Sequence, residues 1–315
     1  MTVMVTGGGG LIGSRIVNKL LARGETVVSF DTNAEQPRLE TQAKNPQLKR
    51  AAGDIRAYDQ LSARIREFSV ERIIHMAAVL APVTEKEPAI GFAVNIGGTT
   101  NVLEAARHCD VQRVCYASSI STYGDQSQYG DGAVDEDSLR NPYNLYGHAK
   151  VINEETAKAY THNFGLDTRG IRIAMVFGHG RLTGRSSAMS RVISAAAVGE
   201  AIVSDVAADQ VSPSIHANDV AEIMVRTCFA ENLQLPVYAG LNAPASIGET
   251  AEVIRRYLPD ANIRFADDAV NYPSITNVDG SRLEQAIDYR LPPFEQSILE
   301  HINEARAERQ MPPLG

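Results

Sequence analysis

Three residues near the middle of the chain could together move a proton. Tyr146 and Lys150 lie in the segment NPYNLYGHAK (141–150), and Ser119 lies in YASSISTYGD (116–125). A spacing of four places Tyr146 and Lys150 on one face of a helix. A lysine ammonium beside a phenol stabilises the phenolate and lowers its pKa from about 10. Such a tyrosine can take the proton of an alcohol, while the hydroxyl of Ser119 orients the same oxygen. The alternative is a tyrosine that only packs and a lysine that is only solvated.

A run of glycines near the N-terminus indicates a second kind of site. The segment TVMVTGGGGLIGSRIV places Gly7, Gly10 and Gly13 between a short apolar run and an amphipathic stretch. A strand, a glycine turn and a helix in this order predict a dinucleotide site, because the backbone can approach a pyrophosphate closely. The helix N-terminus, with Leu11 and Ile12 in its first turn, then offers N–H groups to the phosphates. A glycine-rich turn without a ligand is the alternative.

The next predicted strand supports a dinucleotide, since it ends on an acid. Asp31 lies 18 residues after Gly13, at the end of TVVSF. A carboxylate there accepts hydrogen bonds from the adenosine ribose and repels a 2′-phosphate, so NAD is favoured over NADP. Arg15 and Arg38 keep NADP open, because either guanidinium could bind a 2′-phosphate. If nicotinamide accepts a hydride at this site, Tyr146 would take the proton of the alcohol that is oxidised.

The elements that must position these residues alternate between strands and helices. Strands are predicted at 2–5, 26–30, 48–54, 70–76, 111–118 and 166–178. Helices are predicted at 11–24, 57–68, 88–109, 143–164 and 218–232. This alternation predicts an α/β fold with a doubly wound parallel sheet, which the glycine turn makes Rossmann-type. Asn218 is the expected N-cap of the last helix.

The last part of the chain is expected to form a smaller lobe. The alternation becomes irregular after about Gly178, and most of the prolines follow. We expect an NAD-binding domain over 1–178 with late returns to the sheet near 211–240. Residues 179–315 would form mainly a substrate-binding lobe interleaved with it. Arg181, in the loop that enters this lobe, could meet an anionic substrate group, with surface solvation as the alternative.

Composition restricts the partners and the compartment. The 38 acidic and 30 basic residues give a net charge of −8, which argues against nucleic acid, because phosphate binding requires a basic face. No stretch reaches the roughly 18 apolar residues of a membrane span, and the N-terminus lacks the basic region of a signal peptide. The three cysteines have no metal-type spacing, which predicts reduced thiols in a cytoplasm and no metal site.

Together these motifs resemble the extended short-chain dehydrogenase/reductase family, also called the NAD-dependent epimerase/dehydratase family. The resemblance runs from Thr6 to about Ala221. It is carried by TGGGGLIG, GDI (53–55), HMAA (75–78), VNIGGTTNVLEAA (94–106), SSISTYG, YGHAK and HANDVA (216–221). It implies an NAD-dependent enzyme with the predicted fold.

The resemblance also implies roles for the three central residues. Tyr146 would be the base, Lys150 its pKa partner and a ligand of the cofactor ribose, and Ser119 the partner of the substrate oxygen. Ser119 is preferred to Ser118 because it lies four residues before Tyr123, as in the Ser/Thr-x-x-x-Tyr-Gly pattern of the family.

Further contacts with the cofactor and substrate are expected from the same motifs. The resemblance implies cofactor contacts at Asp54 and Ile55, and at Ala77 and Ala78 in a loop beside the cofactor. Asn95 resembles the asparagine that the family places near the cofactor, with a helix cap as the alternative. On the substrate side we expect Val79, Ser119, Ser121, Tyr146 and Arg181.

Two departures from the family bear on the reaction. Ile120 and Ser121 stand where sugar-nucleotide dehydratases of the family carry an Asp-Glu pair, which argues against elimination of water. No arginine lies between Gln210 and Asn218, where many sugar-nucleotide epimerases of the family bind the diphosphate. We therefore expect a dehydrogenase that oxidises a secondary alcohol of a small sugar-like or hydroxy-acid substrate. The alternatives are a sugar or nucleotide-sugar epimerase that retains NAD, and a non-catalytic NAD-binding sensor, which would not need an activated tyrosine.

The remaining polar motifs are expected to be structural. His75 would end a buried strand, and His216 and Asp219 would form a hinge between the lobes rather than a metal site. The acidic stretch 135–137 is expected to be a solvated loop. A homodimer is implied by the resemblance alone, paired through the long helices at about 88–107 and 147–164.

Overall fold

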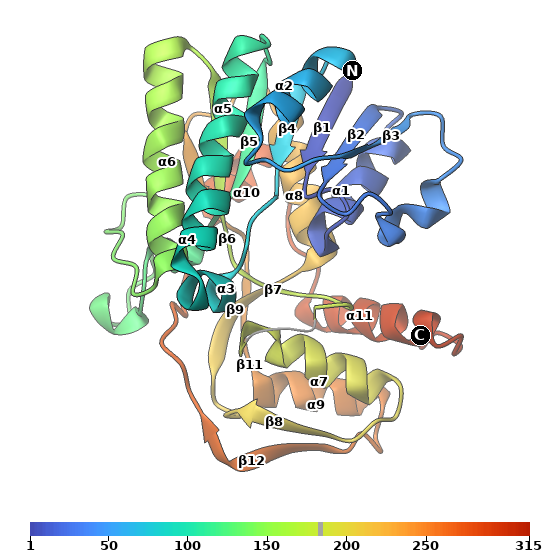
Figure 1. The fold of residues 1–315 in the computed structure, drawn as a ribbon. Helices are drawn as coiled ribbons and strands as arrows, with labels where there is room; N and C mark the ends of the chain where they lie inside the picture. Colours follow the sequence, from blue (N-terminus) through green and yellow to red (C-terminus); the bar gives the residue numbers. More distant parts are fainter. Residues whose placement is uncertain (182–184) are drawn as a thin grey trace.

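The computed structural model describes residues 1–181 and 185–315, and its centre is a twisted parallel sheet (Figure 1). The seven strands run in the order β10-β6-β5-β4-β1-β2-β3, and every neighbouring pair is parallel. They are β1 (Thr2–Thr6), β2 (Thr26–Asp31), β3 (Leu48–Ala52), β4 (Arg72–His75), β5 (Arg113–Ser119), β6 (Asp167–Ile173) and β10 (Val237–Ala239). The predicted doubly wound α/β fold is confirmed.

Helices cover both faces of this sheet, because its strands carry apolar side chains on both sides. One face packs on α1 (Leu11–Ala22), α8 (Ala217–Phe229) and α10 (Ser281–Ile287). The other face packs on α2 (Tyr58–Glu67), α5 (Thr99–His108) and α6 (Leu145–Phe164), and Figure 1 shows α5 and α6 side by side. Among the helices in the described ranges, none combines the length and the apolar character that a bilayer crossing requires.

The strand order creates a switch point beside β1. The chain leaves β1 for β2 on one side, and after β3 it returns to β4 on the other side of β1. Ligands of open α/β sheets bind where the order reverses, outside the carboxyl ends of the strands. The glycine turn follows β1 at this edge, and the segment after β4 starts at the same edge.

A smaller lobe lies below the carboxyl edge of the sheet in Figure 1. Its apolar core joins three helices and two small sheets, of strand order β11-β9-β7 and β12-β8. The helices are α7 (Ala188–Ala197), α9 (Ile247–Tyr257) and α11 (Phe294–Glu308). The strands are β7 (Met175–Phe177), β8 (Ile202–Val206), β9 (Val211–His216), β11 (Ala243–Ser246) and β12 (Ile263–Val270).

The strand expected over 166–178 is two strands, so this prediction is corrected. β6 ends at Ile173 in the large sheet, and β7 begins at Met175 in the three-stranded sheet. One apolar run thus serves two sheets, which periodicity alone cannot reveal. Later the chain returns to the large sheet, where β10 pairs with β6 at the edge.

The helix expected over 88–109 is also interrupted. It consists of α4 (Pro88–Phe92), a π-helical turn η2 (Ala93–Gly98) and α5, and it is preceded by the short helix α3 (Ala81–Lys86). π-Helical turns inside helices are rare and often lie at functional sites. The 3₁₀ turns are η1 (Pro37–Gln42), η3 (Ile120–Thr122), η4 (Gln126–Gln128) and η5 (Arg185–Ser187).

One local prediction at a polar residue is wrong, and another holds only in part. The N-cap of α8 is His216, whose Nδ1 accepts from the backbone N–H of Asn218 at 3.4 Å, so Asn218 is not the cap. The amide of Asn218 instead donates to Glu300 on α11 at 2.6 Å. The loop at 135–137 is not simply solvated, because the side chain of Glu136 is only 5% exposed and accepts from the backbone N–H of Ala239 at 2.9 Å.

Candidate active site

The start of α6 presents Tyr146 to the end of β5. Asn144 caps this helix by accepting from the N–H of Gly147 at 2.8 Å. A Cβ on Gly147 would lie 2.5 Å from the backbone oxygen of Ser121, so the glycine lets the helix pack directly on the segment after β5. Tyr146 stands one position before this contact and shares a hydrogen bond with Ser119.

The structure brings Ser119, rather than Ser118, to the tyrosine. The Oγ of Ser119 also lies 3.1 Å from the Oγ of Ser121, so both predicted substrate-side serines lie at one point. Ser118 contacts α6 eight residues after Tyr146 instead. Its hydroxyl donates to Glu154 on α6 at 2.5 Å.

Lys150 lies one turn below Tyr146 and is buried. Its Nζ donates to the backbone oxygen of Ala117 at 2.6 Å and lies 5.5 Å from the centre of the Tyr146 ring. Burial lowers the pKa of Lys150 to about 8, and the nearby carboxylate of Glu154 opposes this shift. The ammonium is therefore poised to change its charge just above neutral pH.

The pKa of Tyr146 differs from the expectation that a neighbouring lysine depresses it. Burial raises the pKa of this phenol above its usual 10, while the charge of Arg181 and the hydrogen bond with Ser119 oppose the rise. Arg181 is partly buried. Its Nη2 donates to Ser186 at 2.7 Å, and its buried Nε has no hydrogen-bond partner among the described residues. The positive charge of Arg181 therefore acts on Tyr146 in addition to the ammonium of Lys150 near its ring.

The glycine turn forms a cradle at the N-terminus of α1. Gly7 has a positive φ of 70°, and a Cβ on Gly13 would lie 2.0 Å from the backbone oxygen of Gly7. Gly10 is the N-cap and offers no side chain to the first-turn N–H groups of Leu11 and Ile12, and this turn holds no acid. An uncapped helix N-terminus held this closely against a strand fits the pyrophosphate of a dinucleotide.

Asp31 ends β2 beside this cradle. Its carboxylate accepts from the N–H of Gly9 at 3.0 Å and from that of Asn33 at 2.9 Å, which holds it next to the glycine turn. Arg15 is engaged elsewhere, since its Nη2 pairs with Glu304 on α11 at 2.7 Å. The alternative in which Arg15 binds a 2′-phosphate therefore loses its support.

The segment after β4 packs against the cradle and is held by Asn95. A Cβ on Gly7 would lie 2.9 Å from the backbone nitrogen of Ala77, so this segment touches the glycine turn, with Ala78 next in the chain. Asn95 is buried in the π-helical turn, and its amide bonds both the N–H and the oxygen of Val79 at 2.9 Å. The cap alternative for Asn95 is therefore wrong, because its side chain fixes a neighbouring loop.

Asp54 and Ile55 follow β3 at the same edge of the sheet. The carboxylate of Asp54 accepts from Arg56 at 2.9 and 2.5 Å, and this hydrogen bonding lowers the pKa of Asp54. Ile55 is buried, and its side chain lies directly against Gly98 in η2. Ile55 thus packs into the core, while Asp54 is the part of the pair that reaches solvent.

Buried histidines support this framework. His75 ends β4, as expected, and lies between the hydroxyls of Thr6 at 2.6 Å and Thr99 at 3.0 Å. Burial, with a contribution from the charge of Lys150, lowers the pKa of His75 to about 3, so the ring is neutral at ordinary pH. Within the described ranges, no group of three or more histidine, cysteine or acidic side chains is arranged to hold a metal.

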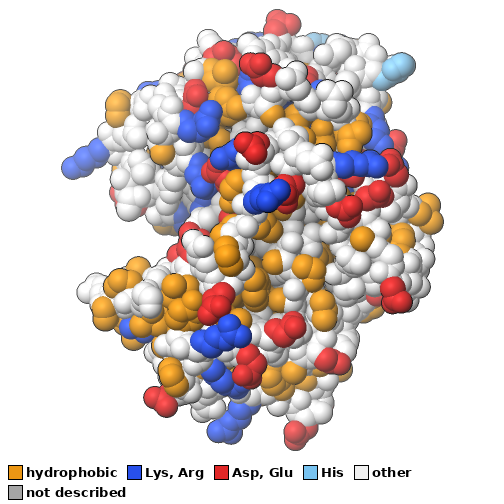
Figure 2. All heavy atoms as spheres, turned by 180° about the vertical axis from the view of Figure 1, so that it is seen from behind, with side chains coloured by type: hydrophobic (Ala, Val, Ile, Leu, Met, Phe, Trp, Pro, Cys, Tyr) orange, Lys and Arg blue, Asp and Glu red, His pale blue; other side chains and the backbone are white. Residues whose placement is uncertain are grey.

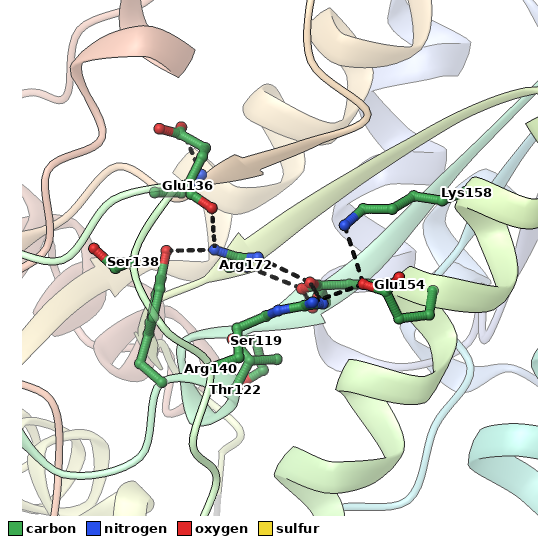
Figure 3. A network of polar contacts seen from close by, with 12 residues as sticks. Ser119, Thr122, Glu136, Ser138, Arg140, Glu154, Lys158 and Arg172 are labelled. Carbon is green, nitrogen blue, oxygen red and sulfur yellow. Dashed lines mark hydrogen bonds and ion pairs between the residues drawn. The ribbon is translucent and has the colours of Figure 1, made fainter.

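Sequence reasoning missed the buried pair formed by Glu154 and Arg172. The guanidinium of Arg172 donates to Glu154 through Nε at 3.0 Å and Nη2 at 2.9 Å (Figure 3). Two signals could have found them. Glu154 continues the four-residue spacing of Tyr146 and Lys150 by one turn, and Arg172 is a charge between two isoleucines of a predicted strand.

An open space separates the sheet from the smaller lobe. Figure 2 shows the molecule hollowed at one side, between the upper part that holds the large sheet and the C-terminal region below it. A cavity of about 420 Å³ also lies between loops of the two parts. Its lining is Asp125, Gln126, Asp209, Gln210, Val211, Asn271, Tyr272, Ser274 and Thr276. Of the described residues that line it, two are acidic and none is a lysine or an arginine.

Comparison with known proteins gives consistent matches. A sequence profile of the NAD dependent epimerase/dehydratase family matches residues 3–234. An uncharacterized epimerase/dehydratase of Staphylococcus aureus is 26% identical, over 96% of this chain and 97% of the relative. Among solved structures, a GalE-like L-threonine dehydrogenase from Cupriavidus necator has 20% identity and a TM-score of 0.86, over 96% of this chain and 99% of that one. The NAD complex of Thermus thermophilus UDP-glucose 4-epimerase has 23% identity and a TM-score of 0.84, over 97% and 99% of the two chains.

Proposed function

Because the chain belongs to the NAD-dependent epimerase/dehydratase family, we propose that it is an NAD-dependent dehydrogenase of a small secondary alcohol that carries an anionic group. The observation that carries this proposal is Arg181, in the loop that enters the smaller lobe, whose positive charge acts on the phenol of Tyr146. A carboxylate next to the reacting alcohol would pair with this partly buried cation. A hydroxy acid therefore fits the site better than a neutral sugar.

The proposed mechanism assigns proton transfer to the residues at the start of α6. Tyr146 takes the proton of the substrate alcohol, and Ser119, already hydrogen-bonded to the phenol, orients the alcohol oxygen. Lys150 contacts the cofactor ribose and keeps a positive charge beside the phenolate that forms. Bound NAD supplies the acceptor for the hydride. Arg181 holds the substrate and opposes the rise of the tyrosine pKa.

The cofactor contacts follow the same edge of the sheet. Gly7, Gly10 and Gly13 would admit the pyrophosphate, and the N–H groups of the first turn of α1 would bind it. Asp31 would accept from the adenosine ribose, which favours NAD over NADP. Support for this preference comes from Arg15, which is paired with Glu304. Further contacts are proposed from Asp54, Ala77, Ala78 and Asn95, and from the backbone at Ile55.

The cavity between the lobes supports a substrate without a diphosphate. Its carboxylates, Asp125 and Asp209, would repel a nucleotide diphosphate, and no cation among its described lining would compensate. Tyr272 lines the cavity, and it also interacts electrostatically with Arg181. Val79 and Ser121 complete the proposed substrate contacts.

Arg181 gives a direct test of the substrate class. Replacing it with glutamine is expected to raise the KM for a hydroxy acid about 10- to 100-fold, since a charge-assisted hydrogen bond contributes roughly 1.5–3 kcal/mol. The affinity for NAD should not change. KM is measured by NADH absorbance at saturating NAD. Arg191→Gln is the control, because Arg191 pairs with Asp205 on the surface of the smaller lobe. An unchanged KM in the Arg181 variant would remove the anion site.

The cofactor content of the purified protein separates the dehydrogenase from an epimerase. An epimerase oxidises and reduces the same carbon, so it must retain NAD through the cycle. We expect the denatured protein to release little NAD, and NADH to accumulate when NAD and a panel of hydroxy acids are added. Near-stoichiometric release of NAD, without NADH production from any panel member, would favour the epimerase. Sugars and nucleotide sugars would then be tested.

We further propose a homodimer through the outer face of the helices α3 to α6. Five large apolar side chains of this region are 38–44% exposed, namely Leu80, Val83, Ile90, Phe92 and Ile152. Light scattering is expected to give twice the chain mass of 34.1 kDa. Ile152→Glu should yield a monomer, because it places a charge in an apolar contact. Val203→Glu, on β8, is the control and should remain dimeric. A monomeric wild-type protein at micromolar concentration would contradict the proposal.

The compartment and partners are proposed on simpler grounds. The three cysteines are free thiols, which fits a reducing cytoplasm. The net charge of −8 does not suit binding to nucleic acid. A small-molecule substrate and a second copy of the chain are the proposed partners.

A further inference from the structure

Three successive residues of β5 bind three turns of α6. Tyr146 bonds Ser119, Lys150 donates to the oxygen of Ala117, and the third contact joins Ser118 to Glu154. The spacing of four along α6 places the tyrosine, the lysine and the glutamate in one column. Glu154 thus extends the predicted catalytic pair by one turn, into the interior of the protein.

Glu154 is a fully buried carboxylate with four hydrogen bonds. Its side chain is 0% exposed. Besides Ser118, it accepts twice from Arg172, and from Arg140 at 3.1 Å (Figure 3). Burial without such partners would be very costly for a charged group. The bonding instead stabilises a negative charge close to the lysine.

Arg172 connects this charge to the loop that follows β5. Its Nη1 donates to the hydroxyl of Tyr123 at 2.9 Å and to the backbone oxygens of Asp135 and Glu136 at 3.3 Å. Through Arg172, the carboxylate of Glu154 therefore links α6 to the loop that leads to the cavity.

Among the charged and titratable groups around Lys150, Glu154 supplies the negative charge that favours the ammonium. From α6 the lysine faces Tyr146 above and Glu154 below. From β4 it faces His75, which is neutral. β5 contributes the backbone oxygen of Ala117. Burial favours loss of the lysine proton, and the Glu154 carboxylate favours its retention.

We propose that Glu154 is a positioning residue that keeps Lys150 charged near neutral pH and fixes the end of β5 against α6. The inference rests on the proposed role of Lys150 as a ligand of the NAD ribose. It does not depend on the identity of the substrate, nor on whether the enzyme is a dehydrogenase or an epimerase.

The test is the pH dependence of NAD affinity, measured by calorimetry from pH 6 to 10. In the wild type the affinity should fall with a midpoint near pH 8, because the lysine loses its charge there. Lys150→Met should remove this step. In Glu154→Gln the midpoint should fall by about one pH unit, which weakens binding at pH 8 several-fold. Glu154→Asp keeps the negative charge, so its pH midpoint should lie close to the wild-type value.

The neighbouring carboxylate supplies a matched control. Glu155→Gln removes the same charge from the same helix, but Glu155 is 53% exposed and pairs with Arg140 and Lys158 at the surface. The pH midpoint of NAD affinity in Glu155→Gln should match that of the wild type. If Glu154→Gln does not fold, Glu154→Gln with Arg172→Gln removes both buried charges. Loss of the Arg172 cation opposes the effect of losing the carboxylate, so the pH midpoint of NAD affinity should lie between the wild-type value and about one pH unit below it.

Two results would overturn the proposal. One is a wild-type affinity without a step that depends on Lys150, and the other is a Glu154→Gln step at the wild-type pH. Loss of turnover in Tyr146→Phe tests the proposed function separately, so failure of one idea leaves the other open to measurement.

Discussion

Replacing Tyr146 with phenylalanine is expected to lower kcat by about 10²- to 10⁴-fold, because proton transfer by a positioned side chain contributes an effect of this size. The phenyl ring retains the packing at the start of α6, and only the hydroxyl that bonds Ser119 is removed. The cradle at α1 and the carboxylate of Asp31 are unchanged. The affinity for NAD, measured by calorimetry, should therefore stay close to the wild-type value while the rate of NADH formation collapses.

Tyr160→Phe is the matched control for this experiment. Tyr160 lies on the same helix, and its hydroxyl donates to Glu104 at 2.8 Å, away from the candidate site. Its removal should leave kcat unchanged. Turnover that persists in Tyr146→Phe would eliminate the proposed base, and an equal loss in both variants would indicate damage to α6 rather than loss of a proton acceptor.

Replacing Gly13 with alanine is expected to abolish detectable NAD binding and to destabilise the protein by roughly 3 kcal/mol, since an overpacked contact costs about this much. The new Cβ would lie 2.0 Å from the backbone oxygen of Gly7, a contact that no rotamer change can relieve. α1 would have to move away from β1, and its first-turn N–H groups would leave the position proposed for the pyrophosphate. Alanine favours helices, so propensity alone predicts the opposite sign.

Gly97→Ala controls for the substitution itself. Gly97 is an exposed glycine of η2, and the nearest atom to its added Cβ would be the backbone oxygen of Phe92 at 3.9 Å. Thermal unfolding and calorimetric titration with NAD compare the two variants. A Gly13→Ala protein that binds NAD like the wild type would mean that the tight packing of α1 on the turn does not shape the cofactor site.

Much of the fold could be predicted because its signals are local. The strands and helices of the first half follow from hydrophobic periods of two and 3.6 residues, which depend only on neighbours in the chain. The strand–glycine–helix order likewise fixes the position of the cradle. The same reasoning fails where one segment serves two environments. The run at 166–178 divides between two sheets, and the helix at 88–109 contains a π-helical turn.

The residues of the candidate site also differ in whether the sequence alone could predict them. The four-residue spacing of Tyr146 and Lys150 and the acid at the end of β2 are properties of the sequence, because one helix or one strand positions each of them. The sequence could not show that the charge of Arg181 acts on Tyr146, since 35 positions separate them and their proximity depends on the tertiary structure.

The electrostatic state of the site was decided only by the tertiary structure. Neighbours along the chain suggested a lysine that lowers the pKa of a tyrosine. In the folded protein burial raises the pKa of Tyr146 and lowers that of Lys150 to about 8. The charges of Arg181 and Glu154 oppose these two shifts. Burial and charge proximity depend on the contacts of several strands and helices at once, so the sequence determines which groups are present, and the packing determines which of them carry charge.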